Sequence, residues 1–216
     1  MIEKLNNNQM PAKIIAPIQS FLDNTGSEMG FAARLAISNQ WLLKPVLLKT
    51  LTSSPATNAL VRTTTAFTMM KGSDAANVVS AVSELTMNFR ILPGESVEDV
   101  INHVKKACKD YDVEYEVVNA REPSAISPQD TKGFNIIRQT INKMYPEAIF
   151  STYITIGGTD AYKYQNVSDN IYRFMPIFLN DYEQRTIHNE NEHISFENFG
   201  RMIEYFKEVM TQYEGA

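Results

Sequence analysis

Alternating apolar and polar positions mark one clear strand in the first half of the chain. Between Glu84 and Ile91 every second residue is apolar, and the residues between them are polar. A period of two predicts a β-strand with one buried face. Residues 63–69 are rich in threonine and also favour a strand, and the turn cluster at 71–74 follows them. We therefore predict a β-hairpin over residues 60–92.

A helix and a further strand are expected after the hairpin. Ser96-Val97-Glu98-Asp99 is similar to a capping box, which predicts a helix start. The predicted buried stripe of this helix consists of Val97, Val100, Ile101, Val104 and Cys108. Apolar residues alternate again over 113–117 and predict a strand. The order strand, strand, helix, strand is typical of the latter part of a small antiparallel sheet with helices on one face. A preceding strand and helix would complete that sheet, and residues 1–60 do not contain the pair.

Residues 1–60 instead predict a helical hairpin. Its apolar residues at helical spacing are Phe31, Leu35, Ile37, Trp41 and Leu42. A second apolar stretch runs to Leu51, but Lys44, Pro45 and Lys49 interrupt it, and it is too short to span a bilayer. Packing helices and a helix lying on a membrane surface both fit this pattern. We predict packing helices.

The second half of the chain predicts an α/β arrangement. A helix is expected at 134–144, a short buried strand at 153–156, a strand at 171–179 and a final helix from Ser195. The predicted buried stripe of the final helix consists of Phe199, Met202, Ile203, Phe206 and Met210. This order is typical of part of a larger sheet with helices packed on it, so the predicted class of the whole chain is α/β.

Composition narrows the range of partners. A net charge of -5 leaves no basic footprint, which predicts no nucleic-acid partner. The single cysteine, Cys108, excludes an intrachain disulfide and is interpreted as a small core residue. The N-terminal residues lack a signal-peptide pattern. We predict a cytoplasmic protein with no membrane partner.

Three groups of residues are candidates for chemistry. Gly157, Gly158 and Thr159 follow an apolar segment, where two glycines let backbone N–H groups approach a carboxylate or a developing oxyanion. A tight strand-to-helix turn explains them equally well. Asn77 and Arg90 combine an amide and a guanidinium, which suit a carboxylate. A surface arginine paired with a nearby acid is the alternative.

The third group is the polar loop at 188–193. His188 and His193, with two glutamates between them, offer imidazole and carboxylate ligands that suit zinc. Their spacing of five does not place the histidines on one helical face, and a solvated loop is the alternative. His103 is predicted to lie on the exposed side of its helix, without a chemical role.

Ordered motifs connect these groups. They are Thr63-Thr64-Thr65 with Thr68-Met69, Asn77-Val78-Val79, Asn88-Phe89-Arg90-Ile91-Leu92-Pro93-Gly94-Glu95, Glu122-Pro123-Ser124, Gly157-Gly158-Thr159-Asp160, Tyr172-Arg173-Phe174-Met175-Pro176 and His188 to Glu192. In this order the chain resembles the carboxypeptidase S branch of the two-zinc carboxypeptidases and aminoacylases (metallopeptidase family twenty), which includes N-acyl amino acid hydrolases. The resemblance runs from about residue 1 to the C-terminus.

The resemblance implies a division of the chain and roles for the candidate residues. Residues 1–120 correspond to most of a lid, or dimerisation, domain with a helical insertion, and residues 121–216 to the last part of a zinc-hydrolase catalytic domain. His188 matches the final zinc ligand. The residues that match substrate-binding groups are Asn77, Arg90, Gly157, Gly158 and Thr159. The implied reaction is hydrolysis of a peptide or N-acyl amide bond by a metal-bound water, with a glutamate as general base.

Departures from the family pattern limit what this chain is expected to do alone. Tyr162, Asn189 and Ser80 stand where the family usually has arginine, glycine and proline. The chain lacks the His-x-Asp motif, the Glu-Glu pair and the Gly-Gly-His motif of the family. Catalytic zinc requires about three protein ligands. We therefore expect two zinc ions in the parent enzyme but none stably bound by this chain, which is predicted to be inactive and truncated.

Three hypotheses remain open. The chain is a C-terminal portion of an amide hydrolase, a non-catalytic binding module derived from the lid, or one half of a site that a separate chain completes. The first implies a peptide or N-acyl amino acid substrate for the parent enzyme. The second implies a homodimer through the lid, because a sheet edge without its neighbouring strand is prone to association.

Overall fold

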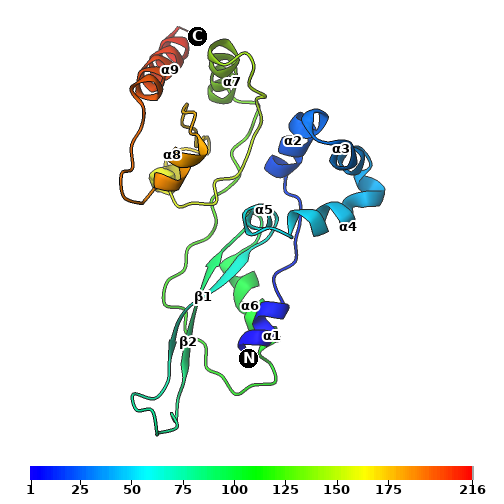
Figure 1. The fold of residues 1–216 in the computed structure, drawn as a ribbon, viewed down its shortest axis with the longest axis vertical. Helices are drawn as coiled ribbons and strands as arrows, with labels where there is room; N and C mark the ends of the chain where they lie inside the picture. Colours follow the sequence, from blue (N-terminus) through cyan, green and yellow to red (C-terminus); the bar gives the residue numbers. More distant parts are fainter. Residues whose placement is uncertain (216) are drawn as a thin grey trace. The chain divides into compact units, whose positions relative to one another are not determined.

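The computed structural model describes residues 1–215 and combines helices with one antiparallel hairpin, which confirms the predicted mixed α/β class (Figure 1). The α-helices are α1 (Ile2–Asn7), α2 (Ala16–Thr25), α3 (Phe31–Ser38), α4 (Gln40–Leu51), α5 (Pro55–Val61), α6 (Val97–Ala107), α7 (Lys132–Met144), α8 (Asp181–Thr186) and α9 (Phe196–Glu214). The short 3-10 helices are η1 (Gly26–Glu28) and η2 (Asp160–Asn166), and the strands are β1 (Thr64–Lys71) and β2 (Glu84–Arg90). None of the helices within residues 1–215 has the length and apolarity needed to cross a bilayer.

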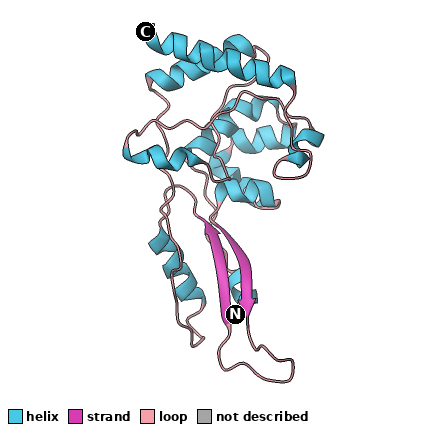
Figure 2. Cartoon of the chain, turned by 90° about the vertical axis from the view of Figure 1, so that its left-hand side faces the viewer, coloured by secondary structure: helices cyan, strands magenta, loops and turns pink. Residues whose placement is uncertain are grey.

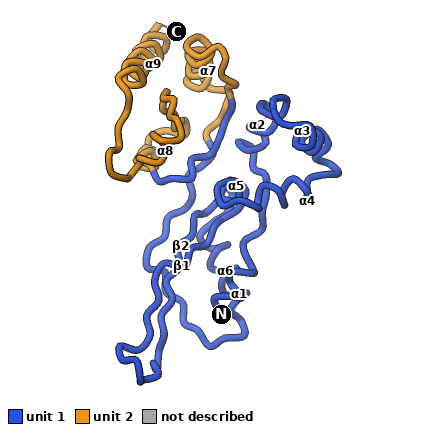
Figure 3. Tube along the Cα trace, viewed as in Figure 1, with its two compact units in different colours: residues 1–126, 151–158 blue, residues 127–150, 159–216 orange. Residues whose placement is uncertain are grey.

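The chain forms two compact units (Figure 3). Unit 1 consists of residues 1–126 and 151–158, and unit 2 of residues 127–150 and 159–216. The chain first passes from unit 1 to unit 2 after Ile126. Residues 151–158 return to unit 1, where the Thr152 hydroxyl donates to the Pro17 carbonyl at 3.2 Å.

The predicted hairpin is confirmed (Figure 2). Strands β1 and β2 pair antiparallel from Thr64 opposite Arg90 to Lys71 opposite Glu84, with one irregularity between Phe67 and Met69. The alternation seen in the sequence gives the hairpin two different faces. On one face, its apolar side chains pack against a buried cluster on α1 and α6. These hairpin side chains are Phe67, Leu85, Met87 and Phe89. The opposite face is open to solvent at Asn88 and Arg90.

Helix α6 begins at the predicted capping box. The Ser96 hydroxyl accepts the Asp99 N–H at 3.1 Å, while the Asp99 carboxylate accepts the Ser96 N–H at 2.8 Å. The Ser96 hydroxyl also donates to that carboxylate, and these bonds hold the pKa of Asp99 below its usual range. The buried stripe of α6 includes Val104 and Cys108, so the interpretation of Cys108 as a core residue is confirmed.

Helices α2, α4 and α5 enclose the second core cluster of unit 1, which consists of Ile18, Leu22, Leu47, Leu60 and Val61. The predicted helical pair is confirmed as α3 and α4, and Ile37 is partly buried against the cluster. The predicted packing face is wrong, however. Phe31, Leu35, Trp41 and Leu42 are between 47% and 83% exposed, because the smaller Ala36 and the opposite side of α4 face the core instead.

In unit 2, α7 lies beside α9 (Figure 1). The predicted stripe of α9 is wrong, because Phe199, Ile203, Phe206 and Met210 are exposed. The buried positions are Asn198, whose side-chain amide pairs with both backbone groups of Phe178, and Tyr205. Burial of Tyr205 raises its pKa to about 12, with a smaller contribution from Tyr145.

Three predicted strands do not form. Residues 113–117, 153–156 and 171–179 have no regular structure within the described chain. An extended segment becomes a strand only when a neighbouring strand takes its backbone hydrogen bonds. The structure offers none: Ile154 packs on the helical cluster of unit 1, and the Ile171 backbone bonds to the Ser127 hydroxyl.

Candidate functional site

Arg90 ends β2 on the open face of the hairpin. Its strand partner is Thr64, and the side chain is exposed. The residues after it turn sharply at Gly94, whose φ of 88° favours glycine. The strand register therefore holds the Arg90 guanidinium on a solvent-facing surface, where it is available to an anionic ligand.

Asn77 lies at the other end of the hairpin. It belongs to the exposed loop between Lys71 and Glu84. Arg90 is six residues further along β2 than Glu84, which corresponds to about 20 Å in an extended strand. The structure therefore does not bring Asn77 and Arg90 together into one clamp within this chain.

Gly157 and Gly158 lie in an exposed segment at the end of unit 1. Neither glycine has a positive φ, and a Cβ atom added to either one would meet no atom within 4 Å among the described residues. The local fold therefore does not itself require glycine at these positions. This observation favours the interpretation that the two glycines let another molecule or segment approach the backbone.

Thr159 begins unit 2 and precedes η2 as its N-cap residue. Its hydroxyl accepts the Nε–H of Arg173 at 3.2 Å. Sequence reasoning did not select Arg173, although the residue stands within the motif Tyr172-Arg173-Phe174. The feature that could have identified it is a single cationic residue within a segment that is otherwise rich in aromatic residues. A guanidinium beside a hydroxyl is suited to binding a carboxylate.

His188 lies just after α8, in the left-handed conformation with φ of 61°. The Asn189 N–H donates to the Thr186 carbonyl at 2.9 Å, and the Asn189 amide donates to the Arg185 carbonyl at 3.0 Å. These bonds satisfy the C-terminal carbonyls of α8. The imidazole of His188 is exposed and has no hydrogen-bond partner within residues 1–215.

The residues around His188 do not form a complete zinc site. His193 donates through Nδ1 to the Asn191 carbonyl at 2.6 Å, and its ring centroid is 5.9 Å from that of Tyr182. Across residues 1–215 no three histidine, cysteine, aspartate or glutamate side chains are grouped as metal ligands. A catalytic zinc ion needs about three protein ligands, so these residues do not fit the ion, and we derive no reaction step from one.

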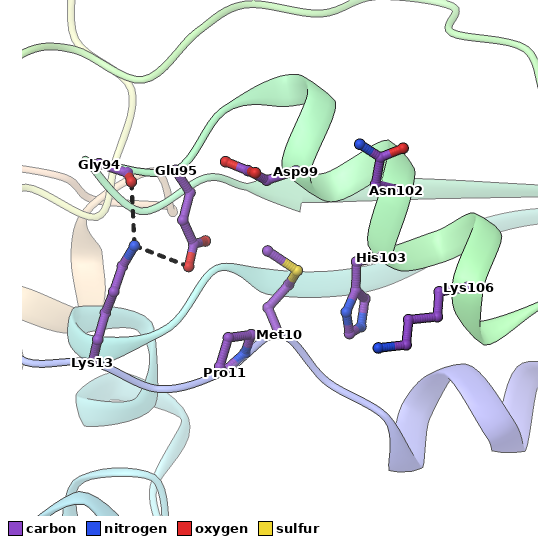
Figure 4. Close-up of a pocket in the computed structure, with 9 residues that line it drawn as sticks. All are labelled: Met10, Pro11, Lys13, Gly94, Glu95, Asp99, Asn102, His103 and Lys106. Carbon is purple, nitrogen blue, oxygen red and sulfur yellow. Dashed lines mark hydrogen bonds and ion pairs between the residues drawn. The ribbon is translucent and has the colours of Figure 1, made fainter.

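Unit 1 also contains an open pocket of about 400 Å³ that sequence reasoning missed (Figure 4). Its lining includes Lys13, Glu95, Asp99, His103 and Lys106. The Lys13 ammonium lies 3.2 Å from the Glu95 carboxylate and donates to the Gly94 carbonyl.

The polar groups that line this pocket already take part in structural contacts, and His103 is the clearest case. Its Nε2 is 2.6 Å from the Asn8 carbonyl, so that nitrogen carries a proton and donates. The ring is half-buried rather than exposed, which corrects the prediction. Together with the capping role of Asp99 and the pairing of Lys13, these contacts give the pocket a structural role: it joins the N-terminal segment to α6.

The candidate residues are divided between the two units. Asn77, Arg90, Gly157 and Gly158 belong to unit 1, whereas Thr159 and His188 belong to unit 2. The two members that the structure joins directly are Thr159 and the newly identified Arg173.

A family model described as "Peptidase dimerisation domain", of the M20 type, matches residues 3–116. The match covers α1 to α6 and both strands.

Several curated proteins are similar over nearly the whole chain. A probable carboxypeptidase S-like protein from Dictyostelium discoideum is 31% identical over 99% of the chain and 41% of its own length. An N-fatty-acyl-amino acid synthase/hydrolase from Homo sapiens is 34% identical over 94% of the chain and 41% of its own length. Carboxypeptidase S from Saccharomyces cerevisiae is 25% identical over 70% of the chain and 32% of its own length. The chain thus spans about two fifths of the first two relatives. No solved structure shows significant similarity to it.

Proposed function

Because the chain belongs to the peptidase dimerisation domain family of M20 type, we propose that it forms the lid and the adjoining C-terminal catalytic segment of a zinc-dependent amide hydrolase. Residues 1–120 supply the lid, with α2 to α5 as a helical insertion, and residues 121–216 supply the catalytic segment. The observation that carries the proposal is the similarity to carboxypeptidase S-like and N-acyl amino acid hydrolysing proteins across almost all of the chain.

The proposed substrate of the complete enzyme is a peptide or an N-acyl amino acid. Either one has a free carboxylate beside the amide bond that is cleaved. Arg90 on the open hairpin face and Thr159 with Arg173 are suited to that carboxylate because they present guanidinium and hydroxyl donors. Asn77, Gly157 and Gly158 complete the proposed substrate-binding set, and the open space around both glycines supports their part in it.

The proposed part of His188 is to be one ligand of a two-zinc site. Its exposed imidazole, held at the end of α8, is free of competing hydrogen bonds within the described residues. We propose no further zinc ligand and no general base among the described residues, and we expect no turnover from this chain alone. Its proposed location is the cytoplasm, which the buried, unpaired Cys108 supports.

Zinc content and turnover of the purified chain test the proposal that this chain supplies only part of the zinc site. We expect less than one zinc ion per chain and no hydrolysis of N-acyl amino acids. Addition of the upstream polypeptide of a carboxypeptidase S-like relative should restore hydrolysis, and His188→Ala should abolish the restored activity, while the control His103→Ala preserves it. Stoichiometric zinc with turnover by the chain alone would refute the assignment of an incomplete site.

A non-catalytic dimerisation module is a second candidate, which the description of the matching family model favours. The lid would then pair two copies of the chain into a homodimer. Light scattering across a range of protein concentrations distinguishes the two candidates, since a module of this kind must dimerise without any upstream polypeptide. A monomer at the highest concentration would exclude it.

A further inference from the structure

Helices α3 and α4 present an apolar surface to solvent. The two helices meet at Asn39, which ends α3 and begins α4 (Figure 1). Their inner sides pack against one core cluster through Ile37, Leu47 and Leu48. Their outer sides therefore both face away from that cluster. We call these outer sides the α3–α4 outer face, which consists of Phe31, Arg34, Leu35, Trp41, Leu42, Val46 and Lys49.

Helical spacing groups the residues of this face. Phe31 and Leu35 are four residues apart on α3, and Leu42 and Val46 are four apart on α4, so each pair shares one side of its helix. All four side chains are at least 47% exposed, and Trp41 is 83% exposed. A helix that is apolar around most of its circumference normally has something covering it. The face is thus larger and more apolar than the single exposed residues that are usual on protein surfaces.

The charges on this face have one sign. Residues 29–73 contain five basic residues and no aspartate or glutamate, although the whole chain has a net charge of -5. Arg34 and Lys49 lie on the α3–α4 outer face and are exposed. Lys49 is three residues from Val46, so its ammonium group rises from the apolar side of α4 rather than from the opposite side. An apolar face whose only charges are positive is complementary to a partner that has anionic groups at its surface and an apolar layer beneath them.

We propose that the α3–α4 outer face docks on the surface of anionic phospholipid bilayers. Phe31, Leu35, Trp41 and Leu42 enter the boundary between headgroups and acyl chains, where an exposed tryptophan is favourable. Arg34 and Lys49 contact the lipid phosphates and carboxylates. This inference goes beyond the proposed hydrolase function and reverses the expectation of no membrane partner, because the structure exposes the face that the sequence predicted to pack.

Trp41 is the only tryptophan of the chain, so its fluorescence reports directly on this face. We expect its emission to shift to shorter wavelength when the 216-residue chain is mixed with vesicles of phosphatidylcholine and phosphatidylserine. The chain should sediment with these vesicles, and raising the salt concentration should release it. Vesicles of phosphatidylcholine alone should bind it much more weakly.

Paired charge removals provide the matched control. Arg34→Gln with Lys49→Gln should weaken binding about thirtyfold, since each basic residue near an anionic surface contributes about a factor of five. Lys105→Gln with Lys109→Gln removes the same charge from exposed positions at the end of α6 and should leave binding within about twofold. All four substituted side chains are exposed, and far-UV circular dichroism verifies that both variants keep the native helices.

Four results would overturn the proposal. They are an unchanged Trp41 emission with the mixed vesicles, equal binding to phosphatidylcholine alone, equal losses in the two paired variants, and a shift that develops with protein concentration in the absence of vesicles. The last result would show that a second copy of the chain covers the face. Because none of these measurements uses turnover, they are independent of the test of hydrolase function.

Discussion

Thr63 connects the hairpin to the turn that follows it. The side chain is fully buried; its hydroxyl accepts the Leu92 N–H at 2.8 Å and donates to the Glu95 carboxylate. Lys13 pairs with the same carboxylate at 3.2 Å. Replacing Thr63 with valine keeps the shape of the side chain but removes both hydrogen bonds. We expect Thr63→Val to destabilise unit 1 strongly.

The size of this effect follows from the groups left without partners. The Leu92 backbone is buried, and an unsatisfied buried donor costs about 1–3 kcal/mol. The Glu95 side chain is 7% exposed and loses a hydrogen bond to a charged group, which is worth about 1.5–3 kcal/mol. Lys13 still pairs with the carboxylate, so we take values near the lower ends of these two ranges. The expected loss in the free energy of unfolding is about 3 kcal/mol in total. In a chain of this size that lowers Tm by about 6–12 °C.

Urea unfolding followed by far-UV circular dichroism measures this loss. The matched control is Thr64→Val, which changes a neighbouring threonine that is half-buried in β1, and we expect it to shift stability by less than about 0.5 kcal/mol. Hydrogen exchange at the Leu92 amide adds a local measurement, because this amide should lose protection in Thr63→Val alone. Equal stability of the two valine variants would refute the assigned network.

Two further predictions concern helix ends. Ser96→Ala should cost about 1 kcal/mol by removing the cap of α6. Since the pKa of Asp99 is lowered in the folded chain, the capping box contributes stability above the ordinary aspartate pKa and loses it as pH falls below about 4. Acid titration of unfolding should show a larger loss in the native chain than in Ser96→Ala, which keeps only the backbone N–H bond of residue 96 to the Asp99 carboxylate. At His188, whose φ is 61°, glycine should be tolerated and alanine should cost up to about 1 kcal/mol more, as measured by thermal unfolding. Equal stability of the two His188 variants would contradict the left-handed geometry.

Local sequence signals succeeded where one segment specifies its own partner. The hairpin from Thr64 to Arg90 was predictable because the alternation, the turn residues and the strand propensities agree, and its two strands pair only with each other. The start of α6 was predictable because the Ser96 and Asp99 bonds lie within one turn. The buried position of Cys108 followed from the stripe of the same helix.

Local signals failed where a distant segment had to supply the partner. Residues 113–117 have the alternation of a strand but no neighbouring backbone to pair with, so they remain irregular. The apolar stripe of α9 predicts burial, yet which side of a helix is covered depends on what packs there, and the structure covers the side of Asn198 and Tyr205.

The candidate site shows the same division. The sequence by itself determined the family of the chain and the residue types suited to a carboxylate, because ordered motifs survive in the chain whatever surrounds them. Only the tertiary structure decided that Asn77 and Arg90 stand at opposite ends of a hairpin, that Arg173 joins Thr159, and that Trp41 faces solvent. Each of these depends on strand register, on a long-range contact or on packing, which are properties that no short segment carries alone.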